Sequence, residues 1–260
     1  MKKLLILAAA LVLAAACNNG SKYTVRGTIT GDSEALVNGK AYLFNQDREN
    51  PIRDTAVVVD GVFKFTGSVI TPEPYVISIE GLPGMVSIFL ENEDFTVTGV
   101  DTAFAESVVT GGQAQTKLNK YADSAEELAE RYGLNDVIEV LGSAEVTEIE
   151  REEAMRTYEQ YQNAVEDLKR SLVADAPVSN LALYLLSQDY IYLDVDTLSS
   201  MLDAYKADPA FAENKYVAEL DEYLQKELSL SIGNKAPDFT LNNPDGEPVT
   251  FSEFYKGNKV

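Results

Sequence analysis

The feature that most constrains this chain is a change of hydrophobic period at Gly111-Gly112. Before the glycine pair, apolar and polar residues alternate in short runs that Gly, Pro, Asn and Asp interrupt. After it, apolar residues return every three or four positions, as in Leu118, Tyr121 and Ala125. A period of two is typical of strands with one buried face, and a period near 3.6 is typical of helices. The sequence therefore predicts a β region over 22–110 and a helical region over 112–230.

Short strands separated by turn residues are expected throughout the first region. The clearest pair is Thr55 to Val59 and Val62 to Thr66, because the Asp60-Gly61 dipeptide between two alternating runs is a strong hairpin signal. Seven such strands at near-regular spacing favour an antiparallel sandwich or small barrel. We expect an α+β protein in which an antiparallel β-sandwich precedes the helices.

Local signals also mark the helices of the second region. A long helix is expected to begin near Thr147, because Glu150 completes a capping box three residues later. A further helix is expected after Pro177 at Ser179-Asn180, and Asp196 is expected to cap the one that follows. The long helix is predicted to bury one apolar stripe: Ile149, Met155, Tyr158, Tyr161, Val165, Leu168 and Leu172.

Composition excludes several kinds of chemistry. The 260 residues contain no tryptophan and no histidine. The absence of histidine excludes catalytic mechanisms and metal sites that need an imidazole. Cys17 is the one cysteine, so neither an intrachain disulfide nor a cysteine-pair metal site can form. The formal net charge of −21 repels phosphate backbones, and we therefore expect no nucleic-acid partner.

Two groups of polar residues deserve a weighed interpretation. Glu91, Glu93, Asp94 and Asp101 could bind a cation such as Ca²⁺, but they lack the ordered spacing of a loop site, so a solvated acidic turn is the preferred interpretation. Tyrosines at helical spacing are interpreted as core residues with their hydroxyls at the rim. The sequence therefore assigns no catalytic, cofactor-binding or metal-binding residue, and no cofactor is expected.

The first seventeen residues have the features of a secretion signal. Lys2-Lys3 is followed by an unbroken apolar run from Leu4 to Ala16, shorter than the ~20 residues that span a bilayer. The end of this run, Ala14-Ala15-Ala16-Cys17, resembles a bacterial lipobox, which implies lipid attachment at Cys17. Ordinary signal cleavage is the alternative and would leave an exposed thiol. We expect residues 1–17 to be a lipoprotein signal, with the mature chain anchored in the cell envelope of a Gram-negative bacterium and facing the periplasm.

The last stretch, 231–260, combines a short strand, a turn at Asp245-Gly246, a second short strand and a helical turn that Ser252 is expected to cap. The order of these pieces resembles the N-terminal segment of thioredoxin-like proteins, in particular the TlpA/ResA-type thiol–disulfide oxidoreductases and the related AhpC/TSA peroxiredoxins. The matching positions are Gly233, Ala236, Pro237, Asp238, Phe239, Thr240, Leu241, Asp245, Gly246, Val249, Ser252, Phe254, Lys256, Gly257 and Val260.

The resemblance implies a thioredoxin-like domain of which 231–260 is the first β-hairpin, with the cysteine motif beyond Val260. It implies a membrane-anchored oxidoreductase with protein thiol or disulfide partners, of which this chain is the N-terminal portion without the catalytic cysteines. Two alternatives stay open: the N-terminal portion of a peroxiredoxin-like peroxidase, and a non-catalytic envelope lipoprotein that binds a partner. We expect the residues after 231 to pack loosely on the rest of the chain.

Overall fold

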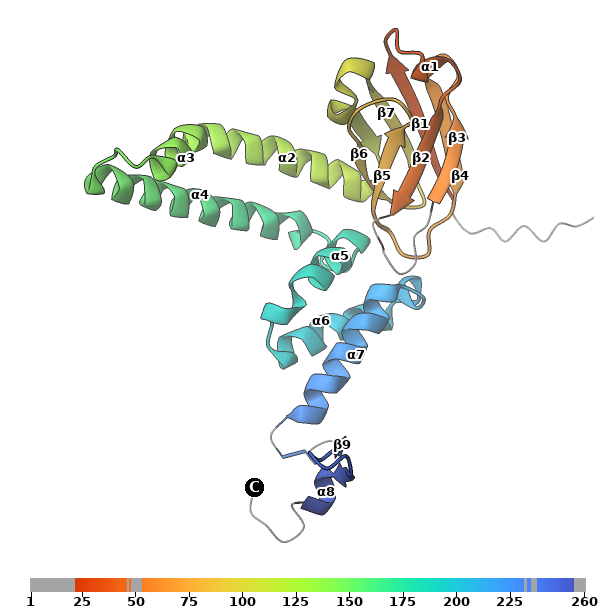
Figure 1. The fold of residues 1–260 in the computed structure, drawn as a ribbon. Helices are drawn as coiled ribbons and strands as arrows, with labels where there is room; N and C mark the ends of the chain where they lie inside the picture. The colour runs from red at the N-terminus through yellow and green to blue at the C-terminus, as the bar shows by residue number, and fades with distance from the viewer. Residues whose placement is uncertain (1–21, 46, 48–52, 232, 235–237, 255–260) are drawn as a thin grey trace, which may run out of the picture.

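The computed structural model describes residues 22–45, 47, 53–231, 233–234 and 238–254. Cys17 and the signal segment lie outside these residues. Figure 1 shows a two-layered β domain, a helical arm that projects from one side of it, a second helical group beneath it, and a small C-terminal hairpin beyond the last long helix. The chain is thus a mixed α+β protein, as expected.

Two four-stranded sheets form the β domain. The first sheet has the order β4-β1-β7-β8 and the second has the order β3-β2-β5-β6. Their bounds are β1 Tyr23–Thr30, β2 Lys40–Asn45, β3 Arg53–Val57, β4 Val62–Gly67, β5 Glu73–Ile79, β6 Val86–Leu90, β7 Asp94–Val100 and β8 Val108–Gly111. A short helix α1 (Ala35–Asn38) follows β1, and a 3-10 helix (Asp101–Glu106) precedes β8.

The alternation in the sequence has the expected consequence. In β1 the inward residues Val25 and Ile29 are buried while Arg26 and Thr28 between them are exposed. Inward residues of both sheets, among them Phe63 and Ile77, meet in one buried cluster. The antiparallel character is confirmed for most neighbours, but β1 pairs with β7 in parallel register, which the sequence analysis did not foresee.

The predicted hairpin at Asp60-Gly61 is wrong. The turn exists, with positive φ at both residues and a bridge between Val59 and Val62, but the chain crosses there from one sheet to the other. β3 pairs with β2, and β4 pairs with β1. The reason is that Val58 points into the core between the sheets, so the strands diverge after one bridge. A tight turn specifies a reversal of direction and leaves the strand partners open.

Three helices form the arm: α2 (Gln113–Arg131), α3 (Leu134–Gly142) and α4 (Glu148–Ala174). The capping box at Thr147 and Glu150 is confirmed. The sequence analysis missed α3. It was also wrong about Ile149 and Met155, which are exposed, and it missed Ala154, which is buried. Leu172 is buried as predicted, and the other predicted members of the stripe are half-buried.

The second helical group comprises α5 (Asn180–Asp189), α6 (Val195–Ala207) and α7 (Lys215–Leu230). Ser179 caps α5 as predicted. The expectation for Asp196 is wrong: the cap of α6 is Asp194, whose carboxylate accepts from the backbone N–H of Thr197 at 2.9 Å, and Asp196 lies in the first turn. Within the described residues, no helix is both long and apolar enough to cross a bilayer.

The C-terminal hairpin consists of β9 (Thr240–Asn242), β10 (Pro248–Thr250) and the short helix α8 (Phe251–Phe254). The antiparallel pairing of β9 with β10 confirms the expected hairpin. Ser252 does not cap the helical turn; it lies inside it, and Asp238 accepts from its backbone N–H at 2.8 Å. The rings of Phe239 and Phe251 stack at 4.9 Å between centroids, yet Leu241 remains 65% exposed.

Candidate functional site

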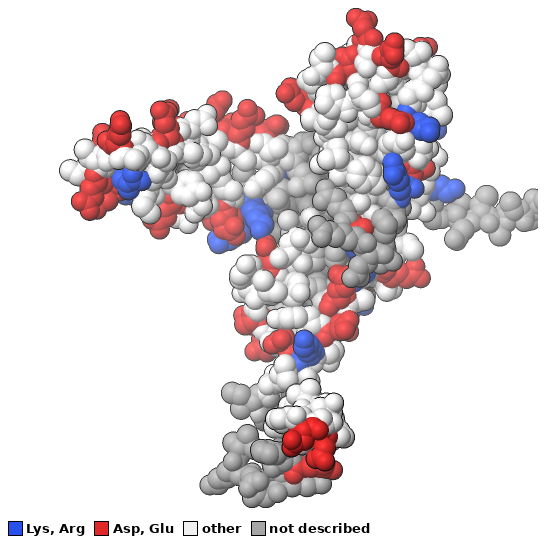
Figure 2. Space-filling view, in the orientation of Figure 1, with Lys and Arg blue, Asp and Glu red and all other residues white. Residues whose placement is uncertain are grey.

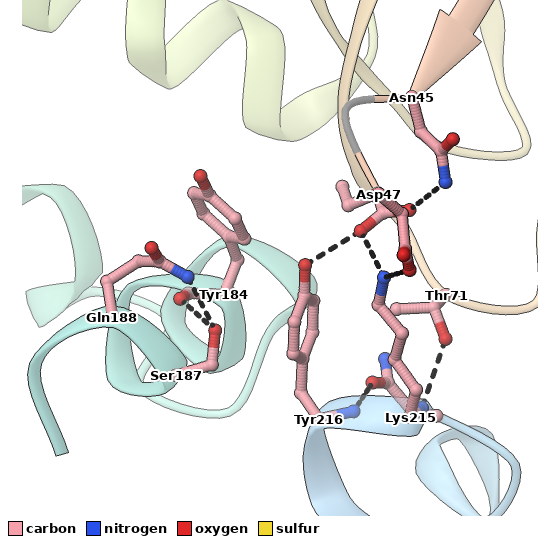
Figure 3. Close-up of polar contacts among 10 residues, drawn as sticks. Asn45, Asp47, Thr71, Tyr184, Ser187, Gln188, Lys215 and Tyr216 are labelled. Carbon is pink, nitrogen blue, oxygen red and sulfur yellow. Dashed lines mark hydrogen bonds and ion pairs between the residues drawn. The ribbon is translucent and has the colours of Figure 1, made fainter. Parts of the chain in front are cut away.

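The most developed polar site lies where the β domain meets α5 and α7. We call it the junction and define it by Asn45, Asp47, Glu73, Lys215 and Tyr216. A pocket of about 390 Å³ opens beside it, and Tyr184 and Gln188 of α5 form part of the wall. Figure 3 shows Asn45 at the end of β2, Asp47 in the loop after it, and Lys215 and Tyr216 in the first turn of α7, with their side chains directed toward one another.

Local sequence signals position the main partners. Glu73 is the first residue of β5, held between Pro72 and Pro74, and it is buried. On the opposite side, Asn214 caps α7 by accepting from the backbone N–H of Tyr216 at 3.0 Å. This cap places Lys215 and Tyr216 in the first turn, facing the strand. The backbone N–H of Lys215 also donates to Thr71 Oγ1 at 3.1 Å.

Glu73 is the centre of the network. Its Oε2 accepts from the Tyr216 hydroxyl at 2.7 Å and lies 2.7 Å from Lys215 Nζ. Its Oε1 accepts from Asn45 Nδ2 at 3.1 Å. The Lys215 ammonium also lies 3.2 Å from Asp47 Oδ2, so one cation bridges two carboxylates. Every one of these contacts joins the β domain to α7 or supports a residue that does.

Burial and the Glu73 charge govern the electrostatics of the junction. Burial by itself would lower the pKa of Lys215, but the hydrogen bond and charge of Glu73, together with Asp47, outweigh it and raise that pKa above its usual value. Burial, followed by the hydrogen bond to Glu73, raises the pKa of Tyr216 well above the ordinary range. Burial and the same carboxylate raise the pKa of Tyr184. At neutral pH the lysine is therefore charged and both tyrosines are neutral.

This arrangement is suited to holding parts together more than to covalent chemistry. A lysine kept as a cation is a poor nucleophile, and a tyrosine with a raised pKa is a poor base. Aromatic contacts extend the network, since the Tyr184 ring meets the Tyr216 and Phe89 rings edge to face at 5.9 and 5.6 Å. The junction is thus a fully partnered polar connection with an open pocket at its side.

The acidic residues singled out in the sequence do not gather into a cation site. Glu91 is buried, and its carboxylate accepts from the backbone N–H of Ala114 at 2.8 Å and from Asn180 Nδ2 at 3.2 Å. Asp101 accepts from the backbone N–H of Ser33 at 2.9 Å. Within the described residues, no group of three or more metal-ligating side chains occurs. The interpretation as a solvated acidic turn is therefore wrong for Glu91, which ties the start of α2 to α5.

The helical tyrosines fall mostly where the sequence analysis placed them. Tyr205 is buried, and its hydroxyl donates to the backbone carbonyl of Pro177 at 2.9 Å. Tyr158 and Tyr161 are half-buried along the arm. The analysis missed the role of Tyr216 and of Glu73. A carboxylate that opens an otherwise apolar strand was the signal available for Glu73, because a buried charge needs a partner.

Comparison with known families adds one finding. Residues 23–118 match the family model described as Domain of unknown function (DUF4369). The DUF4369 match covers well under half of the chain and runs from β1 into the first six residues of α2. It includes Glu73 and ends before Lys215, so it contains one side of the junction. No curated protein and no solved structure matches the chain.

Raising the pH is expected to weaken the junction. Lys215 and Tyr216 have pKa values raised above their ordinary 10.5 and 10.0, so the folded state binds these protons more tightly than the unfolded state. Their stabilisation is therefore complete below about pH 10 and is lost progressively above it. Urea unfolding of the wild type between neutral pH and pH above 10 should show this decline. Tyr216→Phe should show a shallower decline, and an equal slope in both chains would contradict the assignment.

Proposed function

We propose that this chain is the anchor and scaffold of a membrane-tethered thiol–disulfide oxidoreductase of the TlpA/ResA-like type. In this proposal Cys17 bears the lipid, and the β domain and helices hold the module in the periplasm-facing part of the envelope. Residues 231–260 begin the thioredoxin-like module. This chain contains Cys17 as its single cysteine and is expected to lack reductase activity by itself.

The observation that supports the module most directly is the state of the C-terminal hairpin. β9, β10 and α8 have the order that the resemblance implies, yet three apolar side chains of this segment are exposed: Phe239, which precedes β9, Leu241 and Val249. A two-stranded hairpin is marginally stable by itself, and more strands or a packed helix are needed to cover its apolar face. Further thioredoxin-like structure packed on this face would supply that cover.

The module is tested by reading the coding sequence beyond Val260 and assaying its full product. A downstream Cys-x-x-Cys and insulin reduction that its Cys→Ser variants abolish would support the proposal, because the thiolate is the attacking group. The present chain serves as the cysteine-poor control. A downstream sequence without a cysteine-bearing fold would overturn the oxidoreductase assignment, and peroxide reduction through one cysteine would favour the peroxiredoxin-like alternative.

Replacing the predicted lipid attachment residue should release the protein from the membrane. Cys17→Ser removes the thiol to which the diacylglycerol would be attached, and stable anchoring requires at least two acyl chains. We expect the wild type in the membrane fraction with incorporated labelled fatty acid, and the variant without label and in the soluble fraction or retained as precursor. Asn18→Ser is the matched control and should behave like the wild type. A labelled Cys17→Ser chain would contradict the prediction.

A further inference from the structure

The outward side of the sheet β4-β1-β7-β8 differs from the rest of this acidic protein. We call this side the outer face. Figure 2, which shows another side, has Asp and Glu spread over the arm and the β domain. In the paired register of this sheet the outer face carries one carboxylate, Asp94. Its other exposed residues are two basic residues, the valines Val62, Val100 and Val108, and the threonines Thr28, Thr30, Thr66, Thr96, Thr98 and Thr110. Since these residues are exposed, no helix of the described chain covers the face.

Two basic residues stand at the centre of the outer face. Arg26 of β1 lies directly opposite Lys64 of β4, and its other neighbour in register is Thr96 of β7. Both basic side chains are exposed, and neither forms an ion pair within the described residues. The nearest outward carboxylate in the register is Asp94, one row away beside Thr24.

This pairing works against folding stability. Like charges directly opposite each other on neighbouring strands are destabilising. A chain with 42 acidic residues and 21 basic ones could easily place a carboxylate there. A local arrangement that costs stability without a compensating contact indicates a functional surface. An anion bound between Arg26 and Lys64 would supply the compensating contact. The surrounding threonine hydroxyls are suitable hydrogen-bond donors to the oxygens of a phosphate.

The position of Cys17 indicates where that anion comes from. Cys17 precedes Tyr23, the first residue of β1, by six residues, which reach at most about 20 Å when fully extended. A lipid on Cys17 would therefore keep β1 close to the headgroup layer. The acidic remainder of the molecule does not prevent this contact, because charges farther away than about 8 Å are largely screened at physiological ionic strength.

We propose that the outer face rests on an anionic lipid headgroup layer, with Arg26 and Lys64 binding lipid phosphates. This inference rests on the lipid anchor at Cys17 set out under the proposed function, and it adds the side of the β domain that faces the bilayer. Each basic side chain at an anionic membrane surface is expected to strengthen the contact about fivefold.

The test uses the acylated full chain, reconstituted into vesicles of phosphatidylcholine alone or with added phosphatidylglycerol. Mass spectrometry follows the rate at which an amine-reactive reagent modifies Lys64. Lys40 is the internal control, because it is exposed and opens β2 in the opposite sheet. On anionic vesicles we expect Lys64 to react about fivefold more slowly, an effect that high salt abolishes, while Lys40 is unchanged. Arg26→Ser should reduce the protection of Lys64, and Lys40→Ser should leave it intact.

The possible results distinguish a failure of the lipid anchor at Cys17 from a failure of the contact between the outer face and the lipid layer. An N-terminal peptide without acyl mass at Cys17 would overturn the anchor and this inference together. An acylated chain whose Lys64 reacts equally fast on both kinds of vesicle would overturn the outer-face contact alone. Protection of Lys64 by soluble dextran sulfate but not by anionic vesicles would also overturn it, since the partner would then be a polyanionic polymer.

Discussion

Lys215→Met is expected to lower the free energy of unfolding by about 2–3 kcal/mol. Methionine preserves the apolar stem of the side chain, but the ammonium that bridges Glu73 and Asp47 is lost. The Glu73 side chain is 9% exposed, so its charge would remain buried with only neutral hydrogen-bond donors. The expected cost lies below the ~3–5 kcal/mol of a fully buried pair because the Lys215 side chain is 31% exposed. Urea unfolding followed by far-UV circular dichroism measures the change.

Two further variants make the junction test specific. Lys206→Met removes a more exposed pair with Asp221, and its cost should be below about 1 kcal/mol. Glu73→Gln added to Lys215→Met removes the stranded charge and keeps an oxygen acceptor for Tyr216, so the double variant should be more stable than Lys215→Met. The junction has no special role in stability if Lys215→Met costs no more than Lys206→Met.

Leu202→Ala is expected to cost about 3 kcal/mol. Leu202 is fully buried on α6, at 0% exposure, within the cluster formed by α5, α6 and α7. The truncation removes apolar contacts with these helices and leaves a cavity between them. Urea unfolding should show the whole change, and proteolysis should cut first within α5–α7, because that group loses its core while the β domain keeps a separate one.

The neighbouring residue provides the matched control for this prediction. Met201 is 41% exposed on the same helix, so Met201→Ala should cost less than about 1 kcal/mol. Both variants place alanine at adjacent positions of α6, so any change in helix propensity is similar in the two. A larger loss of unfolding free energy in Leu202→Ala therefore measures the burial of Leu202. Similar losses in the two variants would mean that the assigned face of α6 is wrong.

Helix starts were the most predictable part of the fold. Thr147 with Glu150 and Ser179 before Asn180 are local patterns whose hydrogen bonds close within a few residues. The error at Asp196 is of the same local kind: aspartate suits the capping position, two aspartates lie two residues apart, and the backbone geometry makes Asp194 the cap. The buried stripe of α4 was less predictable, since it depends on which neighbours α2 and α3 offer.

Strand partners and the junction could not be predicted in this way. Asp60-Gly61 correctly indicated a turn, but the pairing of β3 with β2 and of β4 with β1 depends on residues far away in the sequence. Glu73 contacts Lys215 and Tyr216, which lie more than a hundred positions later in the sequence. The residues near Glu73 do not predict these partners, and the residues near Lys215 do not predict Glu73. The opposition of Arg26 and Lys64 likewise depends on the register between two separated strands.

By itself, the sequence determined the division into a β region and a helical region, the turns and most helix caps, and the chemistry that a chain without histidine can perform. These properties depend on hydrophobic period and on bonds between near neighbours, which a linear pattern records. The tertiary structure alone decided the sheet order, the buried role of Glu91, the junction around Glu73 and the composition of the outer face. Each of these arises when burial of apolar surface brings distant segments together, and only then do their charges and hydrogen-bonding groups acquire partners.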